Sequence, residues 1–458
     1  LHSPPVAGVG ISGGNRIMRC SVQKQNDIDG SPSNFWLANR ELLDHRWPLL
    51  SQKLGAFDDT VPNWELVDQG ARTLAIDGIQ LTSSYDRCRE AALQAALVPT
   101  ASSQAWVYGL ALGDLPRELL KRPHLEKLSV LILNPAVALL SLACFDHRDW
   151  LDDPRVNLLL ADTHTAPQQP FAAAPSCLLL ADDQAASLRD RLFLELATPF
   201  IRRKHQATPQ LRARLDANTQ WVAKDGDVAE LFGSQAAKTL VVAAAGPTLS
   251  DQYQWLKNTQ QPLLAVDAAL KPLMAAGIVP DWVVTIDGHK EIYQRFFENI
   301  DSDLLSEVPL IYFPAVATEI LEQWPGPRLA AYPDTAPYRQ LAARYPKATL
   351  FSSGSVLHPT IDLAVQMGAA RVVLAGADFC FPGGQSHVAG SGALPLSAGN
   401  GRHWVLDGFG NRVPTTPNLR GFLRDLEDYL GRQRQTSFVN TDRCGAAIAG
   451  TSYLEELS

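Results

Sequence analysis

The stretch of residues 263–287 reads LLAVDAALKPLMAAGIVPDWVVTID and contains a strand, a helix and a second strand in one run. Its two apolar runs, LLAV and WVVTI, end at Asp267 and Asp287, and residues 268–276 between them have a helical pattern. A strand–helix–strand unit places its two strands in parallel with a right-handed crossover. This stretch therefore predicts an α/β fold built on a parallel sheet.

The same alternation continues on both sides of this unit. Further apolar runs of strand length occur at residues 239–244, 310–313, 371–374 and 438–441. Helical patterns cover residues 357–367 and 419–433. We therefore expect a central α/β domain over residues 206–415, completed by a C-terminal helical segment over residues 416–458.

The most apolar stretch, LSVLILNPAVALLSLACF (residues 128–145), is long enough to suggest a membrane span. Asn134 and Pro135 interrupt it in the middle, which predicts a strand, a turn and a buried helix instead. Residues 105–112 and 156–161 are also expected to be strands.

These strands predict a Rossmann-like N-terminal domain over residues 31–205, preceded by a flexible lead-in at residues 1–30. Helices are expected within residues 34–54, where apolar residues recur at helical spacing. Residues 164–175 are rich in Pro and Ala and are expected to form a loop. A charged helical connector is expected over residues 184–220.

The composition is that of a globular protein of more than one domain. The chain has 458 residues, 46% hydrophobic and 19% charged, with a net charge of −8. The acidic balance argues against a broad nucleic-acid-binding surface. The six cysteines include no CxxC pair, and the first residues lack the pattern of a signal peptide. We expect a cytoplasmic protein without membrane insertion or nucleic-acid partner.

A glycine-proline turn follows the strand expected at residues 239–244. It consists of Ala245, Gly246, Pro247 and Thr248. Backbone N–H groups at the start of a helix can bind a phosphate, and glycine permits a sharp turn there. A plain helix start capped by Thr248 or Ser250 would have the same sequence, so both interpretations stay open.

Three aspartates follow expected strands directly. Asp267, Asp287 and Asp378 each stand at a strand end, where open α/β sheets bind their ligands. Each alone could equally cap a turn. Their joint occurrence beside the glycine-proline turn favours a common crevice.

Two further segments carry candidate functional groups. Ser352, Ser353, Gly354 and Ser355 precede a helix and offer hydroxyl and N–H groups to a phosphate or a sugar carboxylate, or simply cap that helix. His387 lies in the glycine-rich segment 382–400, which we expect to be a mobile loop. A histidine there is suited to proton transfer, although an exposed loop histidine is the alternative.

The expected N-terminal domain offers one weaker motif. Residues 107–115, VYGLALGDL, faintly resemble the glycine loop of a nucleotide or methyl-donor site. With only two well-spaced glycines, a purely structural role is the alternative. We find no convincing metal-ligand spacing, Walker loop or nucleophile elbow in the sequence, and predict no metal site.

Six pieces of sequence occur in a characteristic order. They are AAAGPTLSD, the stretch of residues 263–287, FSSGSVLHPTIDLAVQMGAARVVLAGADF, GGQSH, DGFGNRVPTT and FVNTDRCGAAIAGT. Together they resemble the central domain of the motility-associated factor (Maf) flagellin glycosyltransferases, over residues 238–458. The preceding residues are similar, less specifically, to the variable Rossmann-like N-terminal domain of that family.

The resemblance implies transfer of pseudaminic or legionaminic acid, two nonulosonic acids, from a CMP conjugate to Ser or Thr of flagellin. Such a reaction serves flagellum assembly and motility. The implied partners are flagellin and the CMP-nonulosonic acid, and no cofactor is required beyond this activated donor.

The central domain also resembles bacterial sialyltransferases with a GT-A-like sheet, and this similarity implies roles for the candidate residues. The residues implied to line the donor phosphate are Ala245, Gly246, Pro247 and Thr248. Asp267 and Asp287 would lie near the nucleotide or the sugar. The residues implied to contact the sugar side are Ser352, Ser353 and Gly354, with Ser355 beside them. Asp378 would close the crevice.

The chain departs from the sialyltransferases at important positions. Those enzymes have asparagine where Ala245, Asp267 and Asp287 stand here. Their catalytic histidine precedes the C-terminal helix, where this chain reads RVPTT at residues 412–416. The base cannot be carried over, so we expect His387 in that role, with the two aspartates as further catalytic candidates.

Two other functions remain open. The pieces GPTL, AVDAAL and PD are also similar to archaeal-type 6-hydroxymethylpterin diphosphokinases, which use ATP and magnesium. The three strand-end aspartates would then hold the metal. Loss of the asparagines also leaves a non-catalytic chaperone that binds flagellin, although the C-terminal FVNTDRCGAAIAGT piece favours the transferase.

Overall fold

The protein, described here by a computed structural model, folds into two compact units. The structure describes residues 33–55, 62–68, 70–204, 208–394 and 403–454. The first unit takes the chain up to Ala161 together with Gln168–Ala181, and the second takes Asp162–Pro167 and the chain from Asp182 onward. The expected lead-in over residues 1–30 lies outside the described residues.

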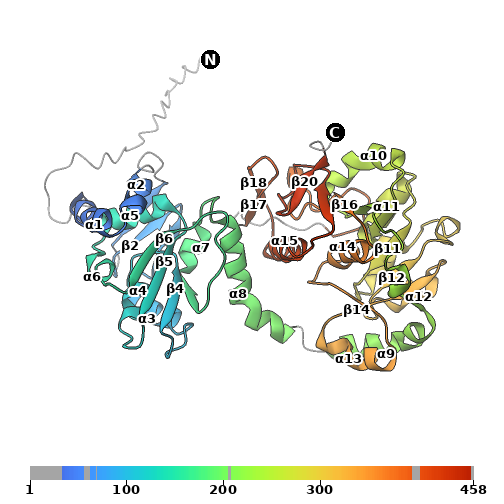
Figure 1. Cartoon of the computed structure of the whole chain (residues 1–458), viewed down its shortest axis with the longest axis horizontal. Helices are drawn as coiled ribbons and strands as arrows, with labels where there is room; N and C mark the ends of the chain where they lie inside the picture. Colours follow the sequence, from blue (N-terminus) through green and yellow to red (C-terminus); the bar gives the residue numbers. More distant parts are fainter. Residues whose placement is uncertain (1–32, 56–61, 69, 205–207, 395–402, 455–458) are drawn as a thin grey trace, which may run out of the picture. The chain divides into compact units, whose positions relative to one another are not determined.

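The first unit combines a parallel sheet with a small antiparallel sheet and helices (Figure 1). Its strands are β1 (Trp64–Val67), β2 (Thr73–Ile76), β3 (Ile79–Gln80), β4 (Gln104–Tyr108), β5 (Lys127–Ile132), β6 (Val156–Leu160) and β7 (Phe171–Ala173). Its helices are α1 (Ser33–Arg46), α2 (Pro48–Gly55), α3 (Arg87–Ala95), α4 (Asp114–Leu120), α5 (Pro135–Cys144), α6 (Arg148–Leu151) and α7 (Pro175–Leu179). The parallel sheet has the order β6-β5-β4-β7.

The apolar stretch of residues 128–145 is a strand, a turn and a helix, as predicted. After β5 the side chain of Asn134 caps α5 by accepting hydrogen bonds from the N–H groups of Ala136 (3.0 Å) and Val137 (3.3 Å). Pro135 occupies the first turn, where a helix needs no N–H donor. Nearly all of α5 is buried within the unit. In the described part of the chain, no helix combines the length and hydrophobicity that a bilayer span requires.

The prediction of a loop over residues 164–175 is wrong in its second half. Phe171–Ala173 form β7, which pairs in parallel with the end of β4. The N–H of Trp106 donates to the carbonyl of Pro170 (3.0 Å), and Ala174 N–H donates to Tyr108 (2.9 Å). A buried strand of three residues between two prolines has no readable alternation, so its pairing with β4 decides its conformation.

The second unit is a larger α/β structure (Figure 1). Its strands are β8 (Gly226–Asp227), β9 (Thr239–Ala243), β10 (Leu263–Val266), β11 (Trp282–Thr285), β12 (Leu310–Tyr312), β13 (Arg328–Ala330), β14 (Tyr332–Pro333), β15 (Thr349–Leu350), β16 (Arg371–Ala375), β17 (Trp404–Leu406), β18 (Arg412–Pro414), β19 (Ser437–Asn440) and β20 (Thr451–Tyr453). Its α-helices are α8 (Ala186–Lys204), α9 (Pro209–Lys224), α10 (Tyr253–Asn258), α11 (Asp267–Ala275), α12 (Thr318–Gln323), α13 (Arg339–Arg344), α14 (Leu357–Gln366) and α15 (Pro417–Leu430).

The main sheet has nine strands in the order β20-β19-β16-β9-β10-β11-β12-β13-β8, and neighbours pair in parallel throughout. Helices cover both faces of such parallel sheets, so successive side chains of each strand are buried. The central strands are therefore continuous apolar runs without alternation. From β9 the chain adds strands on one side as far as β13, and β16 then pairs on the other side of β9. The α/β fold class with parallel sheets is thus confirmed, and the order reverses between β9 and β16.

The C-terminal residues contribute both a helix and strands. Helix α15 matches the helix expected over residues 419–433, with Thr416 as its N-cap and Pro417 in its first turn. Its leucines, such as Leu423 and Leu426, are fully buried. After it, β19 and β20 extend the sheet beyond β16.

A buried network of charges connects α8 to α15. The carboxylate of Asp190 is fully buried and pairs with Arg189 (2.9 Å), Arg420 (3.0 Å) and Arg424 (3.0 Å). Arg424 also binds both carboxylate oxygens of Glu427 at 2.8 Å. These contacts place α8 in the second unit, whereas the sequence-based boundary after residue 205 lies beyond the end of this helix.

Asp190→Asn is expected to destabilise the second unit by about 3–5 kcal/mol, because it leaves buried guanidinium groups without their shared carboxylate. Urea unfolding followed by tryptophan fluorescence measures this loss. Asp183→Asn is the matched control, since its partner Arg412 and Asp183 itself are both about half exposed, and the expected effect is about 0–1 kcal/mol. Equal losses in the two variants would contradict the structural role of the network.

Candidate functional site

The turns that follow β9 and β16 pack directly against each other at the point where the strand order reverses. Gly246 N–H donates to the carbonyl of Gly376 at 2.9 Å. A Cβ atom at residue 246 would lie 2.4 Å from both that carbonyl oxygen and Oδ2 of Asp378. Glycine is therefore required at residue 246 for close packing, and the turn lies where open α/β sheets bind ligands.

Asp378 is the buried centre of this packing. Its Oδ2 accepts from Thr248 N–H (2.9 Å) and its Oδ1 accepts from the Thr248 hydroxyl (2.6 Å). Burial raises the pKa of Asp378 to about 6, although these two hydrogen bonds act to lower it. Gly445 packs against Oδ1 of Asp378, and Ala446 N–H donates to its backbone carbonyl (2.8 Å). Both donors of Thr248, which were expected to bind a phosphate, thus contact Asp378.

Asp267 and Asp287 lie at the ends of the neighbouring strands β10 and β11. Asp267 is buried. Its carboxylate accepts hydrogen bonds from the backbone N–H of Ala268 (2.8 Å) and from the hydroxyl of Thr285 (2.8 Å). Burial raises its pKa to about 7, and the negative charge of Asp287 adds to this increase. Asp287 is about half exposed and accepts from His289 N–H (3.0 Å). The parallel pairing of β10 with β11 thus brings these two aspartates to the same edge of the sheet.

His387 lies on a segment that docks on the glycine-proline turn. The next residue, Val388, donates its N–H to the carbonyl of Ala245 (2.9 Å). Nδ1 of His387 lies 3.1 Å from the hydroxyl of Ser386. Partial burial lowers the pKa of His387, so its imidazole is neutral at pH 7 and able to accept a proton. Residues 395–400 of the expected mobile loop lie outside the described residues.

The serine-rich segment 352–355 makes its hydrogen bonds to helices. The hydroxyl of Ser353 donates to Asp425 of α15 (2.5 Å), and its N–H donates to Nδ1 of His358 (3.2 Å). Nε2 of His358 then donates to the carbonyl of Phe422 (2.9 Å). Ser355 accepts from the first N–H of α14. The segment therefore leads into α14 and is joined to α15 by hydrogen bonds. The side chain of Ser352 is partly exposed, and Gly354 is exposed.

Arg214 on α9 is a cation near the strand ends that was not among the residues predicted from the sequence. A Cβ atom at Gly288 would lie 2.1 Å from Nη1 of Arg214, so the guanidinium group lies directly over the residue that follows Asp287. Nothing in the local sequence marks this arginine, because α9 has polar residues on several faces. Only the tertiary contact reveals it.

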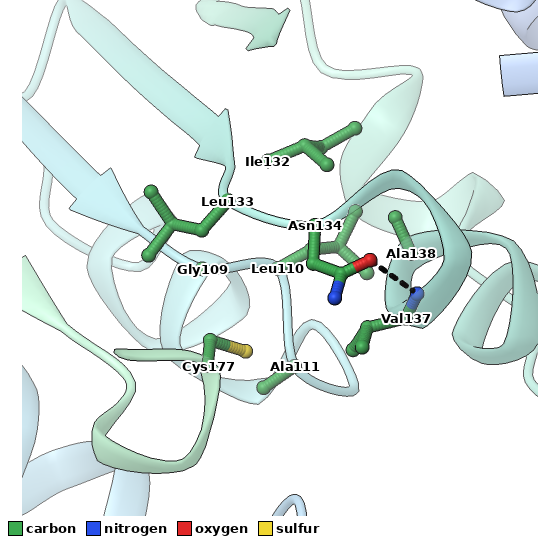
Figure 2. Close-up of a pocket in the computed structure, with 9 residues that line it drawn as sticks. All are labelled: Gly109, Leu110, Ala111, Ile132, Leu133, Asn134, Val137, Ala138 and Cys177. Atoms are coloured by element: carbon green, nitrogen blue, oxygen red, sulfur yellow. Dashed lines mark hydrogen bonds between the residues drawn. The ribbon is translucent and has the colours of Figure 1, made fainter. Parts of the chain in front are cut away.

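The faint glycine motif at residues 107–115 surrounds a very small cavity in the first unit. Figure 2 shows Gly109, Asn134 and Cys177 among the residues that line it. Its volume of about 10 Å³ suffices for roughly one water molecule. A Cβ atom at Gly109 would lie 2.3 Å from Cβ of Cys177, so α7 packs against this turn. The geometry therefore supports the structural role of the motif.

A wider cleft of about 520 Å³ also lies in the first unit. Tyr85 on its rim is 95% exposed. Its two arginines are paired, Arg87 with Asp114 (2.9 Å) and Arg117 with Asp149 (2.6 Å). The cleft thus offers an aromatic ring, and both arginines that line it are already paired with carboxylates.

Comparisons with known proteins give two likenesses. Residues 214–384, less than half of the chain, match the family described as 6-hydroxymethylpterin diphosphokinase MptE-like. Among solved structures, the Maf glycosyltransferase of Magnetospirillum magneticum AMB-1 is similar with 15% sequence identity and a TM-score of 0.43, over 93% of this chain and 75% of that chain. No curated protein matches the chain. Likenesses of this extent leave the function to be argued from the site.

Asp267 predicts a measurable pH dependence of stability. Because its pKa is raised to about 7 in the folded protein, the folded chain holds a proton that the unfolded chain releases, so the free energy of unfolding falls as the pH rises from about 4 to 7. A shift of about three pKa units corresponds to roughly 4 kcal/mol. Asp267→Asn is expected to remove this part of the fall, leaving the smaller part due to Asp378, and to be the more stable protein at pH 8.

Urea unfolding at pH 4.5 and pH 8 measures the effect. Asn retains a carbonyl oxygen for the Ala268 N–H, and the Thr285 hydroxyl can turn to accept from its amide. Asp301→Asn, at an exposed aspartate, is the control and should follow the wild type. Parallel pH profiles for Asp267→Asn and the wild type would show that Asp267 ionises normally.

Proposed function

We propose that this chain is a cytoplasmic glycosyltransferase that moves a nonulosonic acid, pseudaminic or legionaminic acid, from its CMP conjugate to Ser or Thr of flagellin. One observation carries the proposal. Pieces of sequence that resemble the Maf family and lie far apart in the chain pack together around Asp378: the glycine-proline turn, the segment after His387 and the turn at Gly445. They meet where the strand order reverses.

The reaction we propose is a direct displacement. The acceptor hydroxyl oxygen forms a bond to the anomeric carbon, the bond from that carbon to the phosphate oxygen breaks, and CMP leaves with the electron pair. His387 takes the proton of the hydroxyl, a role for which its lowered pKa makes it suitable. At the turn of Gly246, the N–H of Thr248 would stabilise the departing phosphate only after Asp378, its partner in this structure, is displaced. Attack from the side opposite the leaving group inverts the anomeric centre.

The large acceptor needs a surface of its own. The cleft of the first unit, with exposed Tyr85, has the aromatic character that protein-binding surfaces favour. We place flagellin binding there. Asp267 and Asp287 stay candidates for contacts to the nucleotide or the sugar.

Nucleotide preference is the direct test of this function. CMP and CDP are expected to raise the melting temperature of the full chain, and ligand at about one hundred times its Kd should contribute roughly 2.7 kcal/mol. Gly246→Ala should abolish the shift, because the new Cβ atom would disrupt the turn against Asp378. Uridine nucleotides and S-adenosylmethionine are the controls and should have no effect.

A second candidate is supported by the family match. Residues 214–384 match the 6-hydroxymethylpterin diphosphokinase MptE-like family, whose description names a phosphoryl-transfer reaction. In the described residues, no three His, Cys, Asp or Glu side chains gather as a metal site, so Asp267, Asp287 and Asp378 form no such group. A thermal shift with ATP and magnesium, and none with cytidine nucleotides, would favour the diphosphokinase. No shift with any nucleotide would favour a flagellin-binding chaperone.

His387→Ala is expected to lower kcat for transfer by about 10²–10⁴-fold, because it removes the proposed base. The Kd for CMP should stay unchanged, since the imidazole acts on the acceptor hydroxyl. Turnover of CMP-nonulosonic acid with flagellin, followed by CMP release, measures kcat. His164→Ala, at an exposed histidine, is the matched control. Undiminished turnover in His387→Ala would assign the base to another residue.

A further inference from the structure

One buried polar residue of helix α9 forms hydrogen bonds at the carboxyl end of the main sheet, and two apolar residues of the same helix pack in the core, Leu215 and Val222. Asn218 is fully buried, and its amide donates to the carbonyls of Pro314 (2.9 Å) and Val316 (2.8 Å), in the turn that follows β12. Its Oδ1 accepts from the hydroxyl of Thr318 (2.8 Å). These three bonds fix the rotation of α9 about its own axis. The residue one turn earlier on the same face therefore has a fixed position.

That residue is Arg214. Its Nη1 would be 2.1 Å from a Cβ atom at Gly288, and the carbonyl oxygen of Ala315 would be equally near that atom. Glycine at residue 288 thus leaves room for the guanidinium group between the turns that follow β11 and β12. The positive charge of Arg214 also reaches Tyr338, where it acts to lower a pKa that burial raises to about 12.

One nitrogen of the partly buried Arg214 guanidinium group, Nε, is left without a hydrogen-bond partner among the described residues. This nitrogen is itself buried, and no carboxylate of that part of the chain forms an ion pair with Arg214. Other arginines of the unit, such as Arg328 with Asp225 (2.9 Å), have their carboxylates. A buried donor without a partner is costly, and a guanidinium group in that state is suited to a planar anion.

We propose that Arg214 binds an anionic group of the donor, its phosphate or its sugar carboxylate, at the ends of β11 and β12. The identity of this donor rests on the proposed transferase function, but the anion site itself does not. Asp287 is adjacent to Gly288 in the chain, so this site and the strand-end aspartates share one edge of the sheet. A planar guanidinium group can donate two parallel hydrogen bonds to two oxygens of either a phosphate or a carboxylate.

The test compares Arg214→Ala with Arg212→Ala, which removes the same charge from an exposed position of the same helix. Calorimetric titration of the full chain uses four probes: CMP, cytidine, N-acetylneuraminic acid and its methyl ester. If the phosphate is bound, Arg214→Ala weakens CMP binding at least tenfold and leaves cytidine unchanged. If the carboxylate is bound, it weakens the free acid by the same factor and leaves the ester unchanged. Arg214→Lys should restore part of the loss.

Stability separates a binding role from a structural one. Since Nε has no partner to lose and its burial is costly, Arg214→Ala should melt at the same temperature as Arg212→Ala or at a higher one in the absence of ligand. A lower melting temperature together with unchanged binding of all four probes would overturn the inference, as would a wild type that binds none of them. Arg214-dependent binding without transfer to flagellin would defeat the proposed function alone. Transfer by an Arg214→Ala variant at the wild-type rate and affinity would defeat the inference alone.

Discussion

The second unit depends on the contact between Asp378 and the glycine-proline turn. The carboxylate accepts from the N–H and the hydroxyl of Thr248, at the start of the short 3₁₀ helix Pro247–Gln252. It thereby takes the place that an anionic ligand commonly occupies at a helix start. The contact joins β9 to β16 at the reversal of strand order, and Gly246 and Gly445 leave room for it from two sides.

This contact changes how the candidate site can bind a donor. A phosphate at the turn must use donors other than those of Thr248, or it must displace Asp378. Displacement is favoured when Asp378 carries a proton, and its pKa of about 6 makes that form accessible near neutral pH. The strand order thus defines where the site lies. It does not define which hydrogen-bond donors a ligand would use there.

Much of this architecture could be predicted from the sequence, and the reasons are physical. Apolar runs that end in aspartate are typical of buried parallel strands, so Asp267, Asp287 and Asp378 could be placed at one edge of the sheet. The start of α5 at Asn134 could be predicted because Asn is favoured as an N-cap and Pro is favoured in the first turn of a helix. The strand β7 has no such local signal. Its three residues become a strand only through pairing with β4.

The side-chain partners were beyond sequence reasoning because they lie far apart in the chain. Ser353 looked like a ligand-binding serine, yet its hydroxyl binds Asp425 on α15. The membership of α8 in the second unit depends on Asp190, whose three arginine partners include two from α15. Local patterns indicate which elements form, but not which polar groups they satisfy.

The charges at the edge of the sheet bear on whether three aspartates are compatible with the anionic donor that we propose. Three ionised carboxylates would repel a CMP conjugate of an acidic sugar. Burial raises the pKa of Asp267 to about 7 and of Asp378 to about 6, so part of this negative charge is absent near neutral pH. Arg214 adds a positive charge beside Gly288 that no carboxylate of the described chain neutralises. Asp287, half exposed to water, is screened more than the buried pair. The edge is therefore less negative than its composition suggests.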